Sequence, residues 1–263
     1  MLVDVSPAGG SRETAGVLLV DPETDALHRR FRRDLGELSP EDADIFEELA
    51  DDFDSKAREW GATRLLAWLE GCASGFFQVS DRETVEVEDF GSALNRLYRS
   101  YVQPKVLPFR THLPLYSLQA AAGRWGPERD VENEPEEWVE SPPELRRLTE
   151  DMFVAKVIGR SMEPLIPDGS LCVFRGGSAV AGSRQGKRVL VANLGEPGEQ
   201  RFTVKRYESV KTQTGDGGQR NVRVVLHPLN PEFESWELDY EPFDLESSGR
   251  IRVLAEFVGL LGQ

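Results

Sequence analysis

The pattern of apolar and polar positions changes character near residue 105. Before it, three stretches repeat apolar residues at the spacing of amphipathic helices, with short apolar runs around them. After it, most apolar runs alternate with a period of two, which is typical of half-buried strands. The sequence therefore predicts two domains, a small α+β amino-terminal domain followed by a mostly-β domain.

The first part of the chain carries recognisable start and stop signals. Ser39 and Pro40 are expected to cap and begin a helix, and Gly61 to end it. We predict strands at 15–20 and 27–35, helices at 40–60, 62–72 and 90–102, and a hairpin of strands 76–79 and 84–87. The side chains expected to face the core include Ile45, Leu49, Phe53, Ala57, Leu65, Leu66, Trp68, Leu69, Leu94, Leu97, Tyr98 and Tyr101.

Domain boundaries follow from shifts in composition. Residues 1–12 are rich in Ser, Gly and Pro and are predicted to be a disordered tail. The amino-terminal domain then covers 13–105, a Pro-containing linker region covers 106–127, and the second domain covers 128–263. Strands of the second domain are predicted at 138–139, 153–158, 170–174, 188–193, 201–207, 221–226 and 250–261.

Charge argues against nucleic acid as the main partner. The chain has 46 acidic and 31 basic residues, a formal net charge of −15, whereas nucleic-acid binders usually carry a basic surface. One basic cluster, 28–33, lies among acidic segments. We interpret it as a solvated strand or loop whose cations pair with nearby carboxylates.

Cysteine usage and hydropathy indicate a cytoplasmic protein. Cys72 and Cys172 lie in separate apolar runs and are expected to be buried thiols in a reducing compartment. The first 12 residues do not resemble a secretory signal, and no apolar run reaches the roughly 20 residues that span a bilayer. No Cys/His set has metal spacing and 176–186 lacks the ending of a phosphate loop, so no metal or cofactor is expected.

Ser161 is a candidate nucleophile. A strand-like run at 153–158 leads into a turn with Gly159 before the serine and Pro164 after it. A serine there can hold its hydroxyl clear of the sheet beside unpaired backbone N–H groups, as acyl-transfer chemistry requires. The alternative interpretation is an ordinary surface turn.

Lys205 is the candidate base. The three histidines, His28, His112 and His227, form no triad motif with Ser161. Lys205 lies in the alternating run 201–207, on the opposite face from Phe202 and Val204. If it faces inward, burial lowers its pKa and lets it accept the serine proton. The alternative is a solvated strand lysine.

Together these segments resemble the Ser-Lys core of the LexA/UmuD/phage-repressor self-cleaving proteases, the peptidase S24 family. The resemblance rests on Gly159-Arg160-Ser161-Met162-Glu163-Pro164, Ile166-Pro167-Asp168-Gly169 and Phe202-Thr203-Val204-Lys205-Arg206, and it covers roughly residues 113–263. It implies that Ser161 and Lys205 are catalytic, and that Arg160 and Met162 support the turn and its oxyanion hole. A longer hairpin at 194–200 accounts for the wider Ser-to-Lys separation. Leu229–Phe233 resembles the family's Asn-Pro turn near the back of the sheet.

The segment Leu113–Gly123 resembles the part of that family that carries the self-cleavage site. The scissile bond would be Ala122–Gly123. Small residues on both sides suit a bond that must thread into a narrow site. The alternative is a simple Ala-rich linker. Cleavage there is expected to switch off or release the amino-terminal domain.

The amino-terminal domain departs from the family pattern. LexA-like repressors begin with a helix-turn-helix, and none is recognisable here. A winged variant built from 40–60, 62–72 and the 76–87 hairpin would read DNA with a helix that has one basic residue, Arg64. The alternatives to self-cleavage are therefore a DNA-binding transcriptional repressor, a protease that cuts a bound protein partner, and a binding scaffold with little chemistry.

The resemblance also implies partners. They are the chain's own cleavage loop, a second copy forming a homodimer through the protease domain, and a recombinase filament that stimulates cleavage. A role in a DNA-damage response is an analogy with relatives of this kind.

Overall fold

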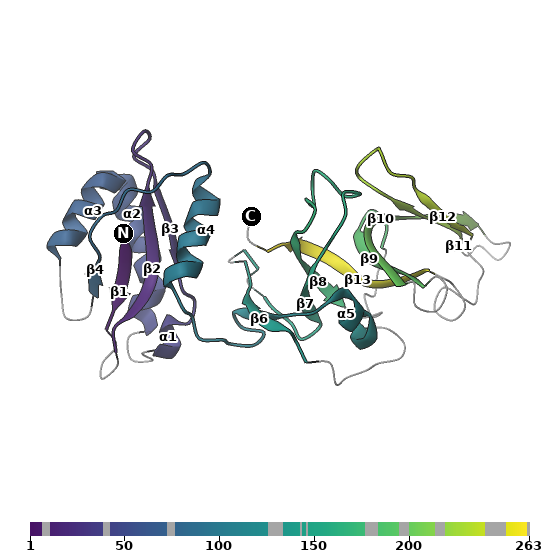
Figure 1. The fold of residues 1–263 in the computed structure, drawn as a ribbon, viewed down its shortest axis with the longest axis horizontal. Helices are drawn as coiled ribbons and strands as arrows, with labels where there is room; N and C mark the ends of the chain where they lie inside the picture. The colour runs from purple at the N-terminus through teal and green to yellow at the C-terminus, as the bar shows by residue number, and fades with distance from the viewer. Residues whose placement is uncertain are drawn as a thin grey trace. The chain divides into compact units, whose positions relative to one another are not determined.

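The protein divides into two compact units, Met1–Leu107 and Pro108–Leu261, which are coloured from purple to yellow along the chain in Figure 1. The computed structural model describes residues 1–6, 11–38, 43–72, 77–125, 134–142, 144–145, 147–176, 184–194, 200–213, 219–239 and 251–261. No helix in these ranges is long and apolar enough to cross a membrane.

Unit 1 is built on a four-stranded antiparallel sheet with the order β3-β2-β1-β4. Its strands are β1 Leu2–Val5, β2 Glu13–Val20, β3 Leu27–Phe31 and β4 Phe77–Val79. Its helices are α1 Leu35–Leu38, α2 Ala43–Trp60, α3 Ala62–Gly71 and α4 Phe90–Tyr101. The Asp89 side chain caps α4 by accepting a hydrogen bond from the Ser92 N–H.

Helices cover both faces of this sheet. Phe53 of α2 and Leu65 of α3 pack with Val3 and Val5 of β1 in one hydrophobic cluster. Tyr98 of α4 packs in a separate cluster with β2 and the residue that follows the helix. Figure 1 accordingly has α4 on the side of the sheet away from α2 and α3. The predicted α+β character of this part is what the structure contains.

The predicted tail is wrong in part, because Leu2–Val5 forms a strand inside the sheet. Val3 and Val5 are fully buried, so two alternating valines are enough to place a strand when partners lie on both sides. Residues 7–10, where the Ser/Gly/Pro character is strongest, lie outside the described residues.

The predicted 76–87 hairpin is also wrong. Only Phe77–Val79 is a strand, and it pairs with β1, while 84–87 has no strand partner. Without a second strand there is no wing, so the winged variant of a helix-turn-helix loses its basis. Ser39 and Pro40, the expected start of α2, lie outside the described residues.

Three predicted core residues are exposed: Ile45, Trp68 and Tyr101 are 56%, 43% and 50% accessible. Ile45 and Tyr101 lie at helix ends, where the apolar stripe extends past the sheet it packs on. Trp68 meets Trp60 edge to face, with 5.7 Å between ring centroids. The apolar periodicity predicted the helices correctly, but it did not predict which of their residues lie beyond the surface of the sheet.

Unit 2 is organised around a nine-stranded sheet with the order β12-β11-β10-β9-β13-β8-β7-β5-β6. The pairings are antiparallel except between β5 and β7. The strands are β5 His112–Leu115, β6 Glu137–Glu140, β7 Met152–Lys156, β8 Leu171–Gly176, β9 Arg188–Leu194, β10 Gln200–Gln213, β11 Gln219–His227, β12 Trp236–Asp239 and β13 Ile251–Leu260. The mostly-β prediction for this half is confirmed.

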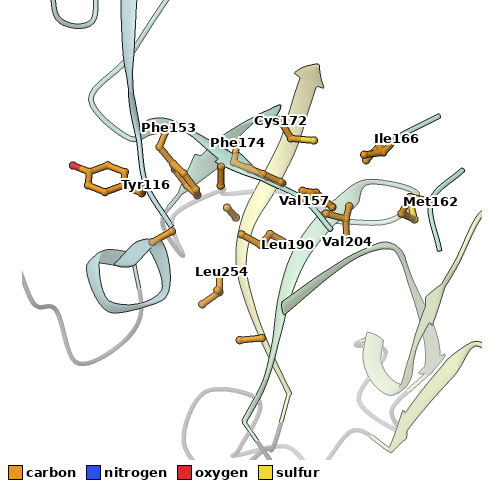
Figure 2. Packing of buried hydrophobic residues seen from close by; sticks show 14 residues of the cluster. Tyr116, Phe153, Val157, Met162, Ile166, Cys172, Phe174, Leu190, Val204 and Leu254 are labelled. Atoms are coloured by element: carbon orange, nitrogen blue, oxygen red, sulfur yellow. The ribbon is translucent and has the colours of Figure 1, made fainter. Parts of the chain in front are cut away.

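One hydrophobic cluster joins the parts of unit 2 that matter for the site (Figure 2). It contains buried residues of the central strands, such as Phe153, Phe174 and Val204, together with Met162 and Ile166 from the turn after β7. Ala121 of helix α5, Leu118–Trp125, packs on the same cluster. The Ser161 turn and the expected cleavage segment are therefore anchored to one core.

The region 106–127 is not the loop that the sequence predicted. Residues 112–115 form β5 and Leu118–Trp125 forms α5, so the Ala122–Gly123 bond lies in a helix. Alanine is the best helix former, and Leu118, Ala121 and Ala122 pack on the core at helical spacing. These contacts favour the helix over an open linker.

Candidate functional site

The turn after β7 holds Ser161 in a fixed frame. Gly159, which has a φ of 117° that favours glycine, donates its N–H to the Asp168 carboxylate at 2.6 Å. The Gly169 N–H donates to the Val157 carbonyl at 2.9 Å and closes the turn at its base. Ser161 itself is partly exposed, on a turn that these two hydrogen bonds close.

The residue after Ser161 anchors the turn. Met162 is 2% exposed and shares a hydrophobic cluster with Val204, which is 1% exposed and directly precedes Lys205 (Figure 2). Ile166 is fully buried in the same cluster, and its N–H donates to the Met162 carbonyl at 3.0 Å. Packing thus places the turn against β10, the strand that carries the candidate base.

Two backbone N–H groups of the turn are unused. Among the described residues, neither the Ser161 amide nor the Met162 amide has a hydrogen-bond acceptor. Arg160 has a different role, because its guanidinium donates to Glu163 at 3.0 Å on the exposed side of the turn. Unpaired N–H groups beside a serine are the donors that an oxyanion requires.

Lys205 faces inward from β10. It pairs in register with Val189 of β9 and is 3% exposed, so the inward orientation is the one the structure has. No ion pair or hydrogen bond connects its ammonium to another described residue. Burial lowers the pKa of Lys205 below its usual range.

Two aromatic rings flank the Lys205 ammonium. Its Nζ lies 5.5 Å from the Trp236 ring centre and 6.0 Å from that of Phe233. These distances are at the outer limit for cation–π attraction, which stabilises the charged form by about 0.5–1 kcal/mol at exposed sites and by about 2 kcal/mol or more where water is excluded. Burial nevertheless lowers the pKa of Lys205, so its ammonium form is less favoured here than in water.

A segment that the sequence did not assign to the site connects the two residues. The Leu229 and Asn230 N–H groups both donate to the Ser161 carbonyl, at 2.9 Å and 3.1 Å, and Phe233 and Trp236 face Lys205. The Asn-Pro turn therefore lies at the candidate site rather than at the back of the sheet. Its aromatic residues, so close to a polar turn, were the signal available in the sequence.

The two candidate side chains are not hydrogen-bonded to each other in this structure, and no described histidine is hydrogen-bonded to Ser161. Catalytic hydrogen bonds are often long before substrate binds. Ala122 and Gly123 remain in α5 and are linked to the Ser161 turn through the shared hydrophobic cluster. The described residues contain no group of side chains that could hold a metal ion.

Comparison with known proteins gives an independent assignment. A comparison with curated proteins finds no match. The Peptidase S24-like family model matches residues 114–252, just over half of the chain, including both candidate residues and the 227–236 connection. The resemblance seen in the sequence is therefore confirmed, and the chain belongs to the Peptidase S24-like family.

Proposed function

We propose that this protein is a LexA-like serine peptidase that cuts its own chain at Ala122–Gly123, with Ser161 as nucleophile and Lys205 as general base. One observation carries the proposal: Lys205 is buried without a compensating carboxylate among the described residues. A lysine in that environment is the group that can deprotonate a serine without histidine.

The proposed reaction proceeds through an acyl-enzyme. Neutral Lys205 takes the proton from the Ser161 hydroxyl, and Oγ bonds to the carbonyl carbon of Ala122. The unused N–H groups of Ser161 and Met162 stabilise the oxyanion. The carbon–nitrogen bond then breaks and the Lys205 ammonium gives its proton to the Gly123 amine. Lys205 next deprotonates a water molecule, which hydrolyses the ester and restores the Ser161 hydroxyl.

The helical conformation of α5 supports a regulated reaction. The serine oxygen must be able to approach the carbonyl carbon of the scissile bond. In α5, however, Ala122 is part of a helix and is partly buried against the core. The segment has to leave the helix before attack. A trigger that favours the unwound segment, such as the recombinase filament implied by the resemblance, would raise the cleavage rate by shifting this equilibrium.

Cleavage at this bond breaks the chain between unit 1, with β5 and the first part of α5, and the rest of unit 2. Release of unit 1 then requires β5 to leave its pairing with β6 and β7. Unit 1 has 12 basic and 22 acidic residues, a net charge of −10 over residues 1–107. This distribution favours a regulatory, protein-binding role for unit 1 over DNA binding. A stress or DNA-damage response is what the family resemblance implies.

Intact-mass spectrometry tests the proposal. Purified protein is incubated at neutral and alkaline pH beside the Ser161→Ala and Lys205→Ala variants. We expect fragments 1–122 and 123–263 from the wild type, formed faster at high pH because Lys205 must be neutral. Fragments of the same mass from either variant would refute the dyad.

A second candidate function is cleavage of another protein molecule, because a substrate segment of a different protein would not have to leave α5 before attack. Mixing wild-type protein with an isotope-labelled Ser161→Ala chain distinguishes the two. Labelled fragments whose yield depends on wild-type concentration indicate cleavage in trans. A labelled chain that stays intact while the wild type is cut indicates cleavage in cis.

A further inference from the structure

The connection between β11 and β12, residues 227–236, contacts both candidate catalytic residues. We propose that this connection assembles the dyad: Asn230 is a positioning residue for the Ser161 turn, and Trp236 with Phe233 excludes water from Lys205. The inference rests on the proposed function, and it assigns two separate tasks to residues outside the Ser-Lys pair.

Asn230 is bonded to the nucleophile turn from two directions. Its side-chain Nδ2 donates to the Arg160 carbonyl at 3.1 Å, and its backbone N–H donates to the Ser161 carbonyl at 3.1 Å. The Leu229 N–H donates to the same carbonyl at 2.9 Å. Asn230 is 8% exposed, so water does not readily replace these bonds. They fix the backbone on both sides of the Ser161 Cα.

The connection is rigid enough to transmit this position. The Asn230 Oδ1 accepts the Glu232 N–H at 3.0 Å and its carbonyl accepts the Phe233 N–H at 3.2 Å. At the base of the connection, the Nδ1 of His227 lies 3.0 Å from the Ser235 hydroxyl, next to the Leu226–Trp236 strand pair. Asn230 and Trp236 are thus held at fixed positions in one closed turn.

Residues at the other end of the connection, Phe233 and Trp236, lie beside Lys205. Trp236 is partly buried in the cluster that also contains Tyr207, the neighbour of Lys205 on the same face of β10. The two rings lie 5.5 Å and 6.0 Å from Nζ and occupy space from which water would otherwise solvate the ammonium. The same turn therefore positions Ser161 and excludes water from the Lys205 ammonium.

The two tasks predict different kinetic defects. Loss of the Asn230 contacts misplaces the serine and lowers the rate at every pH. Loss of the Trp236 ring admits water to Lys205, stabilises the ammonium and moves the pH dependence to higher pH. A residue that only stabilised the fold would not separate the plateau rate from the midpoint pH.

The first experiment measures self-cleavage of the full chain from pH 6 to 11 with Asn230→Ser. Serine retains a short acceptor for the Glu232 N–H but cannot replace the amide donor to Arg160. We expect a plateau rate lower by about 10-fold, as for one lost buried hydrogen bond, with an unchanged midpoint pH. Asn193→Ser in β9 is the matched control and should cleave at the wild-type rate. A wild-type plateau in Asn230→Ser would overturn the positioning role.

The second experiment measures the titration of Lys205 by NMR and does not depend on cleavage. The chain has only six lysines, so the Cε signal of Lys205 can be followed by NMR in ¹³C-lysine-labelled Ser161→Ala protein and assigned with Lys205→Arg. We expect Trp236→Leu to raise the titration midpoint of Lys205, and Trp68→Leu in unit 1 to leave it unchanged. An unchanged midpoint in Trp236→Leu would overturn the water-excluding role.

The two measurements separate the inference from the function on which it rests. A wild-type chain that never cleaves contradicts the proposed function, and the NMR titration still decides whether Trp236 governs Lys205. A wild-type chain that cleaves, with both variants equal to it, overturns the inference and leaves the dyad in place.

Discussion

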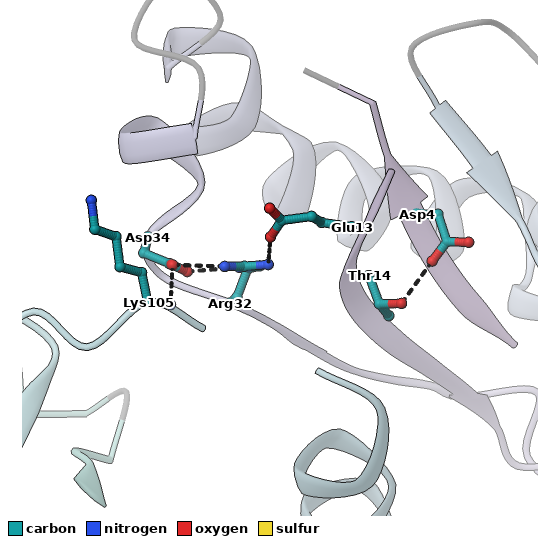
Figure 3. Close-up of polar contacts among 6 residues, drawn as sticks. All are labelled: Asp4, Glu13, Thr14, Arg32, Asp34 and Lys105. Atoms are coloured by element: carbon teal, nitrogen blue, oxygen red, sulfur yellow. Dashed lines mark hydrogen bonds and ion pairs between the residues drawn. The ribbon is translucent and has the colours of Figure 1, made fainter. Parts of the chain in front are cut away.

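Among the described residues, each unit buries one arginine or lysine side chain, and the two have opposite surroundings. Arg32 of unit 1 is 4% exposed and Lys205 of unit 2 is 3% exposed. The Arg32 guanidinium binds Asp34 through two hydrogen bonds of 2.8 Å and Glu13 through one of 2.6 Å (Figure 3). Lys205 has aromatic neighbours and no ion pair with a described residue.

The difference shows that burial alone does not make a base. Burial lowers the pKa of Arg32 by itself, but the contacts with Asp34 and Glu13 outweigh it and the net pKa is raised. Burial would likewise raise the pKa of Asp34, but Arg32 and the Lys105 N–H hold it below its usual value. At Lys205 no carboxylate of a described residue opposes burial, and the pKa is lowered. Arg32 is therefore a cation that stabilises the fold, whereas Lys205 is a candidate general base.

The sharpest way to break this comparison is Lys205→Arg. Guanidinium does not lose its proton in proteins, so the substitution preserves the charge and removes the base. We expect self-cleavage to fall by about 10³-fold at every pH, within the range for loss of a general base, as measured by fragment formation. Lys187→Arg, which can retain the partly buried ion pair with Glu256, is the control and should cleave normally. A pH-dependent reaction in Lys205→Arg would show that another group is the base.

The matching change in unit 1 is Arg32→Met, which leaves two carboxylates without their cation. Breaking a buried pair on one side costs about 3–5 kcal/mol, and we expect that loss in the free energy of unfolding of unit 1 by urea titration. Replacing Arg32, Asp34 and Glu13 together by apolar residues should restore most of it. Equal stability of Arg32→Met and the wild type would mean that the network is not important for the fold.

The two sites should also make stability depend on pH, with the same sign but in different pH windows, because both folded-state pKa values are lowered. Because the folded-state pKa of Asp34 is lowered, its contribution is present above its ordinary pKa and is lost as pH falls through the folded value. We expect Asp34→Asn to cost about 2 kcal/mol at neutral pH and progressively less below pH ~4.

Lys205 gives a rise of stability with pH in the alkaline range, where Asp34 no longer titrates. Its lowered pKa means that the unfolded chain binds the proton more tightly, so the cost of burying it disappears as pH rises toward the ordinary lysine pKa. Lys205→Met should therefore flatten the alkaline side of the stability profile measured by urea unfolding. If the stability of the wild type did not rise at alkaline pH, or if the same rise remained in Lys205→Met, the lowered pKa would be contradicted.

The smallest effect is expected for a cation that is neither buried nor alone. Arg29 of β3 binds the Asp54 carboxylate through two hydrogen bonds, with side chains 22% and 39% exposed. Exposed pairs contribute about 0.2–1 kcal/mol, so Arg29→Ala should change the free energy of unfolding by that amount and cleavage not at all. A loss as large as that of Arg32→Met would erase the distinction between the two arginines.

Much of the site could be predicted because local sequence determines it. Alternation in 201–207 placed Lys205 and Val204 on opposite faces of one strand, and their separate surroundings agree. The basic cluster also behaves as interpreted in its main feature, since Arg29 and Arg32 pair with carboxylates, although Arg32 is buried rather than solvated. Period and charge along the chain were sufficient for these conclusions.

Other features depended on contacts between distant segments. The role of Asn230 required the 227–236 connection to meet the Ser161 turn some 70 residues earlier. The burial of Val3 required strands on both sides of β1. The 84–87 run alternates as a strand should and forms none, because no partner lies beside it.

The sequence by itself determined which groups are available for catalysis, namely a serine in a glycine-flanked turn and a lysine on a strand. It also determined the family to which the chain belongs. Only the tertiary structure decided that Lys205 is buried without an ion pair among the described residues, whereas Arg32 is buried with two carboxylates. The same is true of the helix that holds Ala122–Gly123. The physical reason is that a pKa and a helix on a core both depend on what surrounds a residue in space, which side-chain type and spacing do not specify.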